Sequence, residues 1–139
     1  MIKNNIVSFD FDGSLNDHFN GEKNPQSLEV QELAKTLIAE GFSVHIVTRR
    51  YGPDNSHKGI KNEHVEVYEI ATKLGVSHDN VHFTNREWKY NKLSEIGANF
   101  HIDDDEQDIS YIHTYCNGVI GFHLNENNGP WKFYNLLKE

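Results

Sequence analysis

Two aspartates, Asp10 and Asp12, stand one residue apart directly after an apolar run at residues 6–9. The β-branched and aromatic residues of that run predict a buried strand, and Gly13 allows the chain to turn after it. Because ligands of an open parallel sheet bind beyond the carboxyl ends of its strands, both carboxylates would lie at the mouth of the fold. Carboxylates this close repel one another unless a cation lies between them, and Mg²⁺, which prefers oxygen ligands, is the natural choice.

Two further polar residues lie next to predicted elements. An apolar run at residues 42–47 ends in Thr48, which a right-handed crossover places beside Asp10. Threonine is common in strands, so its weight comes only from its position after the first helix. Lys89 stands near the start of a predicted helix, where a cation opposes the helix dipole, so helix stability does not explain it. Lys92, one turn further along, is the alternative.

An acidic cluster follows a predicted strand at residues 99–102 and begins with Asp103 and Asp104. Acidic residues are also favoured at helix N-termini by capping and by the helix dipole, which is the simpler explanation. Two aspartates aligned with the first pair across a parallel sheet would nevertheless need a cation. Asp103 is the first choice as a metal ligand, with Asp104 in support, and Asp108 is a weaker alternative.

The segment Asp-Phe-Asp-Gly-Ser-Leu at residues 10–15 resembles the first motif of the haloacid dehalogenase superfamily of phosphohydrolases. Thr48, Lys89 and the Asp103-Asp104 pair match the second, third and fourth motifs in their order along the chain. Four matches, each at a predicted strand end or helix start, argue against coincidence. The resemblance covers most of the chain, from about residue 4 to residue 124.

The resemblance implies a phosphatase that hydrolyses phosphate monoesters through an aspartyl-phosphate formed on Asp10. Asp12 would protonate the leaving oxygen and later activate water, while Thr48 and Lys89 would offset the charge of the transferring group. It also implies Mg²⁺ as cofactor. The ligands would be Asp10, Asp12 through its carbonyl, Asp103 and Asp104.

Members of this superfamily select substrates largely through cap domains inserted after the first or the third strand. Here residues 16–24 and the short stretch after the third strand leave no room for a folded cap, so the site should be open. The loop at residues 49–61 has an excess of basic residues in an acidic protein. We expect Arg49 and Arg50, together with Arg86, to contact an anionic or nucleobase-bearing substrate. Solvated loop charges are the alternative.

Nucleotide monophosphates are the favoured substrates, ahead of sugar phosphates by a small margin. An open site would also admit polynucleotide ends or phosphoproteins. The alternative from a different functional class is a non-catalytic phosphate-sensing or partner-binding domain on the same fold. Response-regulator receivers use a comparable acidic pocket, but they place the phosphorylated aspartate after the third strand, where this chain has Thr84 and Asn85.

Strands and helices alternate along the rest of the chain. Further strands are predicted at residues 42–48, 81–84, 99–102 and 118–124. Helices are predicted from Pro25 with Asn24 as cap, at residues 63–74, 85–97 and 109–116, and from Pro130 after a turn at 125–129. This alternation predicts an α/β protein: a three-layer Rossmann-like fold with a mainly parallel five-stranded sheet and no sizeable cap domain.

The length of 139 residues predicts one domain over residues 1–139. With 13 basic and 21 acidic residues the net charge is −8, which argues against an extended nucleic-acid-binding surface. No segment is typical of a signal peptide or membrane span, and the lone Cys116 cannot form an internal disulfide, so we expect a cytoplasmic protein. Four of the nine histidines lie in predicted strands: His45, His82, His101 and His123. These positions indicate packed or hydrogen-bonded side chains and not the ligands of a zinc site.

Overall fold

The computed structural model describes residues 5–125 and 129–138. Its centre is a sheet in which β1 (Ile6–Phe9) occupies the middle position. The other strands are β2 (Ser43–Thr48), β3 (Val81–Phe83), β4 (Phe100–Asp103) and β5 (Ile120–His123). The strand order is β3-β2-β1-β4-β5, and all four pairings are parallel. The predicted five-stranded sheet is confirmed, and the described part of it is entirely parallel.

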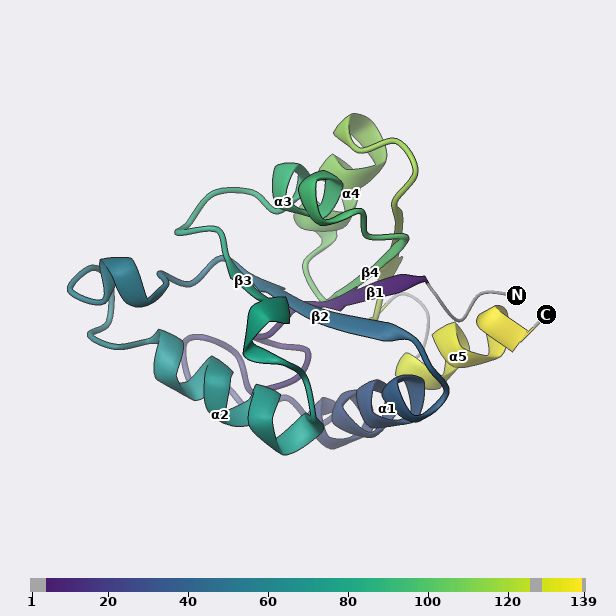
Figure 1. Ribbon diagram of the computed structural model, residues 1–139, viewed down its shortest axis with the longest axis horizontal. Helices are drawn as coiled ribbons and strands as arrows, with labels where there is room; N and C mark the ends of the chain where they lie inside the picture. Colours follow the sequence, from purple (N-terminus) through teal and green to yellow (C-terminus); the bar gives the residue numbers. More distant parts are fainter. Residues whose placement is uncertain (1–4, 126–128, 139) are drawn as a thin grey trace.

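Helices cover both faces of the sheet (Figure 1). They are α1 (Ser27–Ala39), α2 (His64–Leu74), α3 (Tyr90–Ile96), α4 (Glu106–Tyr115) and α5 (Pro130–Lys138), with short 3₁₀ turns at Pro53–Asn55 and His78–Asn80. In Figure 1, α3 and α4 lie above the sheet, and α1, α2 and α5 lie below it. These three layers, with no cap domain in the described residues, confirm the predicted fold. No described helix has both the length and the apolar character to span a bilayer.

The larger core lies between the sheet and the lower helices. Val7 and Phe9 of β1 are fully buried there with Leu33 of α1, because alternate residues of a strand face opposite sides of the sheet. A smaller core on the other face brings together Leu93 of α3 and Ile112 of α4. Strand β1 is therefore packed from both sides, and the carboxylates that follow it extend from a rigid element.

Helix α1 begins later than the sequence predicts. We expected Pro25 to be the first helical residue, whereas the helix starts at Ser27. The Asn24 side chain accepts a hydrogen bond of 3.1 Å from the backbone N–H of Gln26, which closes a turn before the helix. The same side chain donates to the carbonyl of Ser14 at 3.0 Å. Asn24 therefore joins the entry of α1 to the turn after β1 instead of capping the helix.

Helix α3 also begins later than predicted, at Tyr90 rather than Asn85. Asn85 and Arg86 have φ angles of 55° and 74°, a left-handed conformation that cannot be part of a right-handed helix. Lys89 consequently occupies the N-cap position of α3 and not its first turn. The predicted helix is present, but its first five predicted residues belong to the preceding loop.

The bounds of β2, β3, β4 and β5 differ from expectation by one or two residues. Strand β5 is shorter than the predicted 118–124, and β4 extends one residue past Ile102 to include Asp103. Asp103 pairs in register with His123 on β5, so the backbone that carries its carboxylate is part of the sheet. The turn predicted at 125–129 lies partly outside the described residues.

We predict that Leu33→Ala lowers the free energy of unfolding by about 2–5 kcal/mol, because it removes a fully buried side chain between α1 and the sheet. Leu28→Ala in the same helix is the matched control. Leu28 is 67% exposed, and its truncation should change the free energy of unfolding by less than about 0.5 kcal/mol. Urea denaturation of both variants tests the packing, and equal losses would contradict it.

Candidate active site

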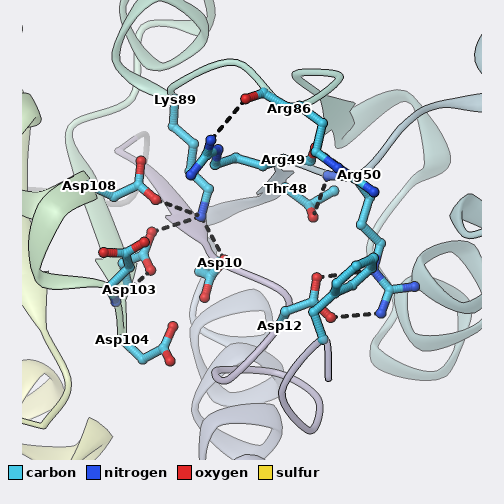
Figure 2. Close-up of a pocket in the computed structure, with 12 residues that line it drawn as sticks. Asp10, Asp12, Thr48, Arg49, Arg50, Arg86, Lys89, Asp103, Asp104 and Asp108 are labelled. Carbon is cyan, nitrogen blue, oxygen red and sulfur yellow. Dashed lines mark hydrogen bonds and ion pairs between the residues drawn. The ribbon is translucent and has the colours of Figure 1, made fainter. Parts of the chain in front are cut away.

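A pocket of about 310 Å³ opens at the carboxyl ends of the strands. All nine residues that the sequence predicts for the site line it: Asp10, Asp12, Thr48, Arg49, Arg50, Arg86, Lys89, Asp103 and Asp104. Phe19, Asp105 and Asp108 complete the lining. Figure 2 shows these side chains converging from the ends of β1, β2 and β4, the start of α4 and the loop before α3. The prediction that parallel strands bring these residues to one edge is confirmed.

The ammonium group of Lys89 lies among three carboxylates (Figure 2). Its Nζ is 2.6 Å from Oδ1 of Asp10, 2.7 Å from Oδ2 of Asp103 and 3.7 Å from Oδ2 of Asp108. The side chain is only 2% exposed. Burial alone would lower the pKa of Lys89, but the carboxylates raise it well above its usual value, so the group is a permanent cation.

Lys92, the alternative lysine, lies elsewhere. Its Nζ pairs with Oε2 of Glu95 at 2.8 Å within α3, and it does not line the pocket. Of the two lysines, only Lys89 can act on a ligand in the pocket. The difference follows from the late start of α3, which leaves Lys89 at the helix entrance where its side chain can reach the strand ends.

Asp10, Asp103 and Asp104 offer carboxylate oxygens that all lie within 4.8 Å of one another. Burial and the charge of Asp103 raise the pKa of Asp10 well above its usual value, although Lys89 opposes this. The carboxyl groups of Asp10 and Asp104 are hydrogen-bonded, and burial also raises the pKa of Asp104. Burial would raise the pKa of Asp103 too, but Lys89 and His101 hold it far below its usual value. Burial and mutual repulsion thus raise the pKa of Asp10 and Asp104, whereas Lys89 and His101 lower that of Asp103.

Helix capping does not explain the Asp103-Asp104 pair. The N-cap of α4 is Asp105, whose Oδ1 accepts a 2.8 Å hydrogen bond from the backbone N–H of Gln107. Asp103 instead accepts the N–H of Asp105 at 2.9 Å, and Asp104 lies toward Asp10 and His18. Asp105, the residue after the pair, thus caps the helix, and the carboxylates of Asp103 and Asp104 line the pocket instead.

Asp12 lies apart from this cluster. Its carboxylate accepts two hydrogen bonds from Arg50, of 3.0 Å from Nε and 2.6 Å from Nη2. Arg50 is only 8% exposed and also contacts the Glu63 carbonyl at 2.7 Å and the Glu66 carboxylate at 3.0 Å. Figure 2 shows Asp12 turned toward Arg50 and away from Lys89. The two aspartates of the first motif therefore occupy separate environments, one beside a lysine and one beside an arginine. The predicted ligation through the Asp12 carbonyl stays a prediction.

Gly13 brings the turn after β1 into close contact with Asp104. The residue has a φ angle of +80°, and a Cβ atom built there would lie 2.2 Å from Oδ2 of Asp104. The next residue, Ser14, donates a 2.9 Å hydrogen bond to Oδ2 of Asp10. The turn that the sequence predicts for Gly13 thus also sets the distance between the first and fourth motifs.

The three arginines of the pocket are engaged in the protein itself. Arg49 donates to the Arg86 carbonyl at 2.9 Å and stacks on Trp88 with its Cζ 4.1 Å from the ring centroid. Arg86 forms two hydrogen bonds with Glu63, of 2.6 and 2.9 Å. Each of these arginines thus has partners within the protein. Their contact with substrate and the alternative of solvated loop charges both stay predictions.

Thr48 is almost fully buried at the end of β2, and its Oγ1 accepts a hydrogen bond of 3.3 Å from the backbone N–H of Arg50. Its hydroxyl hydrogen is thus left to donate. The side chain lines the pocket, as a residue that holds a phosphoryl oxygen must.

Asp105 is one of two pocket residues that the sequence did not single out, and the other is Phe19. Phe19 is 41% exposed, and the guanidinium carbons of Arg50 and Arg86 lie 5.0 and 5.1 Å from its ring centroid. The sequence feature that could have identified Phe19 is its place as the lone aromatic residue in the polar stretch at 16–24. Asp108, the weaker alternative for the fourth motif, lines the pocket too, and burial raises its pKa to about 6.

Comparison with known proteins does not place the chain in a family. No protein-family model and no curated protein sequence matches it. What is established is therefore an α/β protein with a parallel sheet and a pocket of opposed charges at the carboxyl ends of its strands.

We predict that Gly13→Ala destabilises the protein by at least about 1 kcal/mol more than Gly21→Ala. Both glycines have positive φ angles, so both variants carry backbone strain. Only at Gly13 would the new methyl group collide with Asp104, whereas nothing lies within 4 Å of it at Gly21. Denaturant unfolding measures the difference, and equal stabilities would show that the turn does not pack against Asp104.

We predict that Lys89→Met lowers the free energy of unfolding by about 3–5 kcal/mol at pH 8, because it leaves buried carboxylates without their cation. Without Lys89 the pKa of Asp103 in the folded protein rises. A carboxyl group whose folded-state pKa lies above its unfolded-state pKa destabilises the protein as the pH rises past the unfolded-state pKa. The variant should therefore gain stability between pH 8 and pH 5.

Lys92→Met is the control, since its pair with Glu95 is at the surface of α3 and should contribute less than about 1 kcal/mol. Denaturant unfolding in chelator at both pH values measures the effect. A Lys89→Met protein as stable as the Lys92→Met protein at pH 8 would show that Lys89 is not the counter-ion of the cluster.

Proposed function

We propose that this protein is a small capless phosphatase of the haloacid dehalogenase type, which hydrolyses phosphate monoesters with Asp10 as nucleophile. The observation that carries the proposal is the position of Lys89, whose Nζ contacts both Asp10 and Asp103 at 2.6 and 2.7 Å. A carboxylate that attacks a phosphate dianion needs positive charge beside it, and a buried lysine supplies that charge without solvent screening.

The acidic cluster fits a divalent cation. Asp10, Asp103 and Asp104 provide carboxylate oxygens, the ligands that Mg²⁺ prefers, within 4.8 Å of one another. The raised pKa of Asp10 also marks a site with less positive charge than its carboxylates require. We propose Mg²⁺ at this cluster; when bound, it would offset charge on the phosphoryl group and keep Asp10 ionised.

Asp10 is oriented for attack by two donors. Lys89 donates to its Oδ1 at 2.6 Å and Ser14 to its Oδ2 at 2.9 Å. In the proposed reaction a carboxylate oxygen of Asp10 forms a bond to phosphorus, and the bond from phosphorus to the ester oxygen breaks. The ester oxygen leaves with the electron pair and takes up a proton. Water then attacks the phosphorus of the aspartyl-phosphate, which releases inorganic phosphate and restores Asp10.

Asp12 is proposed to give the proton to the leaving oxygen and to take one from water in the second step. Each carboxylate oxygen of Asp12 accepts one hydrogen bond from Arg50 and keeps a second lone pair, so the group can reach a substrate oxygen or water without leaving the arginine. Arg50 also contacts the Glu63 carbonyl, which holds the guanidinium in place.

Nucleotide monophosphates remain the proposed substrates. The pocket is also lined by Arg49, Arg50 and Arg86 and by the exposed ring of Phe19, a set suited to a base and an anionic group. The alternative substrates of the proposed phosphatase are sugar phosphates, polynucleotide ends and phosphoproteins. The buried, free Cys116 is compatible with the proposed cytoplasmic location.

A second candidate, a non-catalytic phosphate-binding domain, is favoured by one observation. Asp12 is held by two hydrogen bonds to a nearly buried arginine, which fixes the position of its carboxylate as a binding site would. Such a domain would bind Mg²⁺ and phosphate analogues without turnover. Catalysis and binding are therefore separated by a rate measurement.

We predict Mg²⁺-dependent release of phosphate from p-nitrophenyl phosphate and from a panel of nucleotides and sugar phosphates. Asp10→Asn should lower the rate by at least about 100-fold, because an amide oxygen is a poor nucleophile for phosphorus. Asp54→Asn is the matched control, since Asp54 is an exposed aspartate in the Pro53–Asn55 turn.

The same assay separates the two functions. Activity that Asp10→Asn and a chelator both abolish, and that Asp54→Asn retains, is the result the proposal requires. No release from any member of the panel, with Mg²⁺ bound to the protein, would favour the binding domain. Release that survives in Asp10→Asn would contradict the proposed nucleophile.

A further inference from the structure

Three polar side chains lie in the protein interior next to the pocket. Ser8 on β1 and His101 and Asp103 on β4 are each fully buried. Ser8 and His101 are in register on adjacent strands. Both faces of a parallel sheet are normally covered by apolar side chains, and a polar group buried there needs a partner for each donor and acceptor. The serine and the histidine have no part in the proposed reaction, so their presence needs a separate explanation.

The three side chains form a continuous hydrogen-bonded row. Ser8 Oγ is 2.9 Å from Nδ1 of His101, and Nε2 of His101 is 2.8 Å from Oδ2 of Asp103. An ionised carboxylate only accepts, so Nε2 carries the ring hydrogen. Nδ1 is then the acceptor, and the Ser8 hydroxyl is the donor. In the neutral imidazole the carboxylate thus sets the tautomer, and Ser8 satisfies the second ring nitrogen and holds the ring in this orientation.

This row is not a nucleophilic triad. Ser8 and His101 are fully buried and neither lines the pocket, so no substrate can reach the serine oxygen. Both nitrogens of the imidazole are occupied. Among the three, only Asp103 lines the pocket, and any effect of His101 on a ligand must pass through Asp103.

The carboxylate of Asp103 is held by three donors. Its Oδ2 accepts from His101 at 2.8 Å and from Lys89 at 2.7 Å, and its Oδ1 accepts from the backbone N–H of Asp105 at 2.9 Å. The donors come from β4, the loop before α3 and the start of α4, so they fix both the tilt and the rotation of the group. A carboxylate has about four lone-pair sites, which leaves one for a cation.

We propose that His101, oriented by Ser8, is a positioning residue that fixes Asp103 as a ligand for a divalent cation. This inference rests on the proposed metal site, but it concerns cation affinity and not turnover. Donors that hold the ligands of a metal site from behind typically change its affinity by about 10–100-fold when they are removed. Without His101 the carboxylate keeps Lys89 and the backbone N–H of Asp105, and loses the one donor that comes from its own strand.

The test measures Mg²⁺ binding to the full chain by isothermal titration calorimetry in the absence of substrate. His101→Leu removes the donor to Asp103 and should weaken Mg²⁺ binding by at least about 10-fold. His101→Gln, whose side-chain amide reaches a similar distance and keeps an N–H donor, should recover most of that loss. Ser8→Ala should produce a smaller loss of about 2–5-fold, because the imidazole is then free to present either nitrogen.

His45→Leu is the matched control for burial. His45 is a nearly buried strand histidine that stacks on His82 with a hydrogen bond of 2.9 Å and lies outside the pocket lining. Its replacement should alter stability and leave Mg²⁺ affinity unchanged. The comparison separates a positioning effect from a general loss of stability.

A second measurement keeps the inference testable if His101→Leu does not fold. Long-range ¹⁵N NMR of the wild-type imidazole should show His101 neutral with its hydrogen on Nε2, and Ser8→Ala should change the ring-nitrogen shifts. A hydrogen on Nδ1 in the wild type would overturn the proposal. So would folded His101→Leu or Ser8→Ala protein with wild-type Mg²⁺ affinity.

The results also distinguish this inference from the proposed function. Wild-type protein that binds no Mg²⁺ would overturn both the metal site and the positioning role. Wild-type protein that binds Mg²⁺, loses affinity in the His101 series and releases no phosphate would support the positioning role and contradict the phosphatase.

Discussion

The contact of the Lys89 ammonium group with the carboxylates of Asp10 and Asp103 is the interaction on which the site depends. Six aspartates and four basic residues line the pocket, and Arg86 among the latter is paired with Glu63, which is not part of it. The charge near Asp10 is therefore strongly negative. A lysine that is 2% exposed is unusual unless paired, and here its partners are all in the pocket.

The fold allows this concentration of charge because the strands are parallel. Their carboxyl ends meet at one edge, where Asp10 follows β1 and Asp103 ends β4, its neighbour. Apolar packing on both faces of β1 holds the carboxylates together against their mutual repulsion. A buried ion pair contributes more to a specific arrangement than to net stability, so the hydrophobic layers supply the free energy that the charged edge costs.

The two aspartates that follow β1 pair with different cations, Asp10 with Lys89 and Asp12 with Arg50. Lys89 contacts Asp10 through one oxygen, which leaves the second to Ser14, whereas Arg50 occupies both oxygens of Asp12. The two carboxylates are one residue apart in sequence, yet their partners come from the α3 entrance and the end of β2. In the proposed phosphatase this division would separate the nucleophile from the acid–base group. In a binding domain it would fix two anions.

The architecture could be predicted because it follows from short-range patterns, whereas Thr48, Lys89 and the Asp103-Asp104 pair were chosen for their resemblance to motifs of a known superfamily. Apolar runs between amphipathic segments indicate parallel strands, and the chemistry-bearing residues sit where those strands end. The start of α3 could not be predicted, since it depends on a left-handed angle at Arg86, a residue type that rarely adopts one, in addition to Asn85, which does so more readily. Which arginine binds Asp12 depends on contacts 38 residues apart. Ser8 and His101 look like ordinary strand residues until the register of β1 and β4 places them side by side.

The most direct test of the central claim is fluorine-19 NMR of beryllofluoride binding in Mg²⁺, because beryllofluoride on a carboxylate mimics an aspartyl-phosphate without requiring turnover. The account predicts slowly exchanging bound resonances that require Mg²⁺ and disappear in Asp10→Asn. No bound resonances in the wild type, or the same resonances in Asp10→Asn, would contradict the claim that the carboxylate beside Lys89 accepts a phosphoryl group.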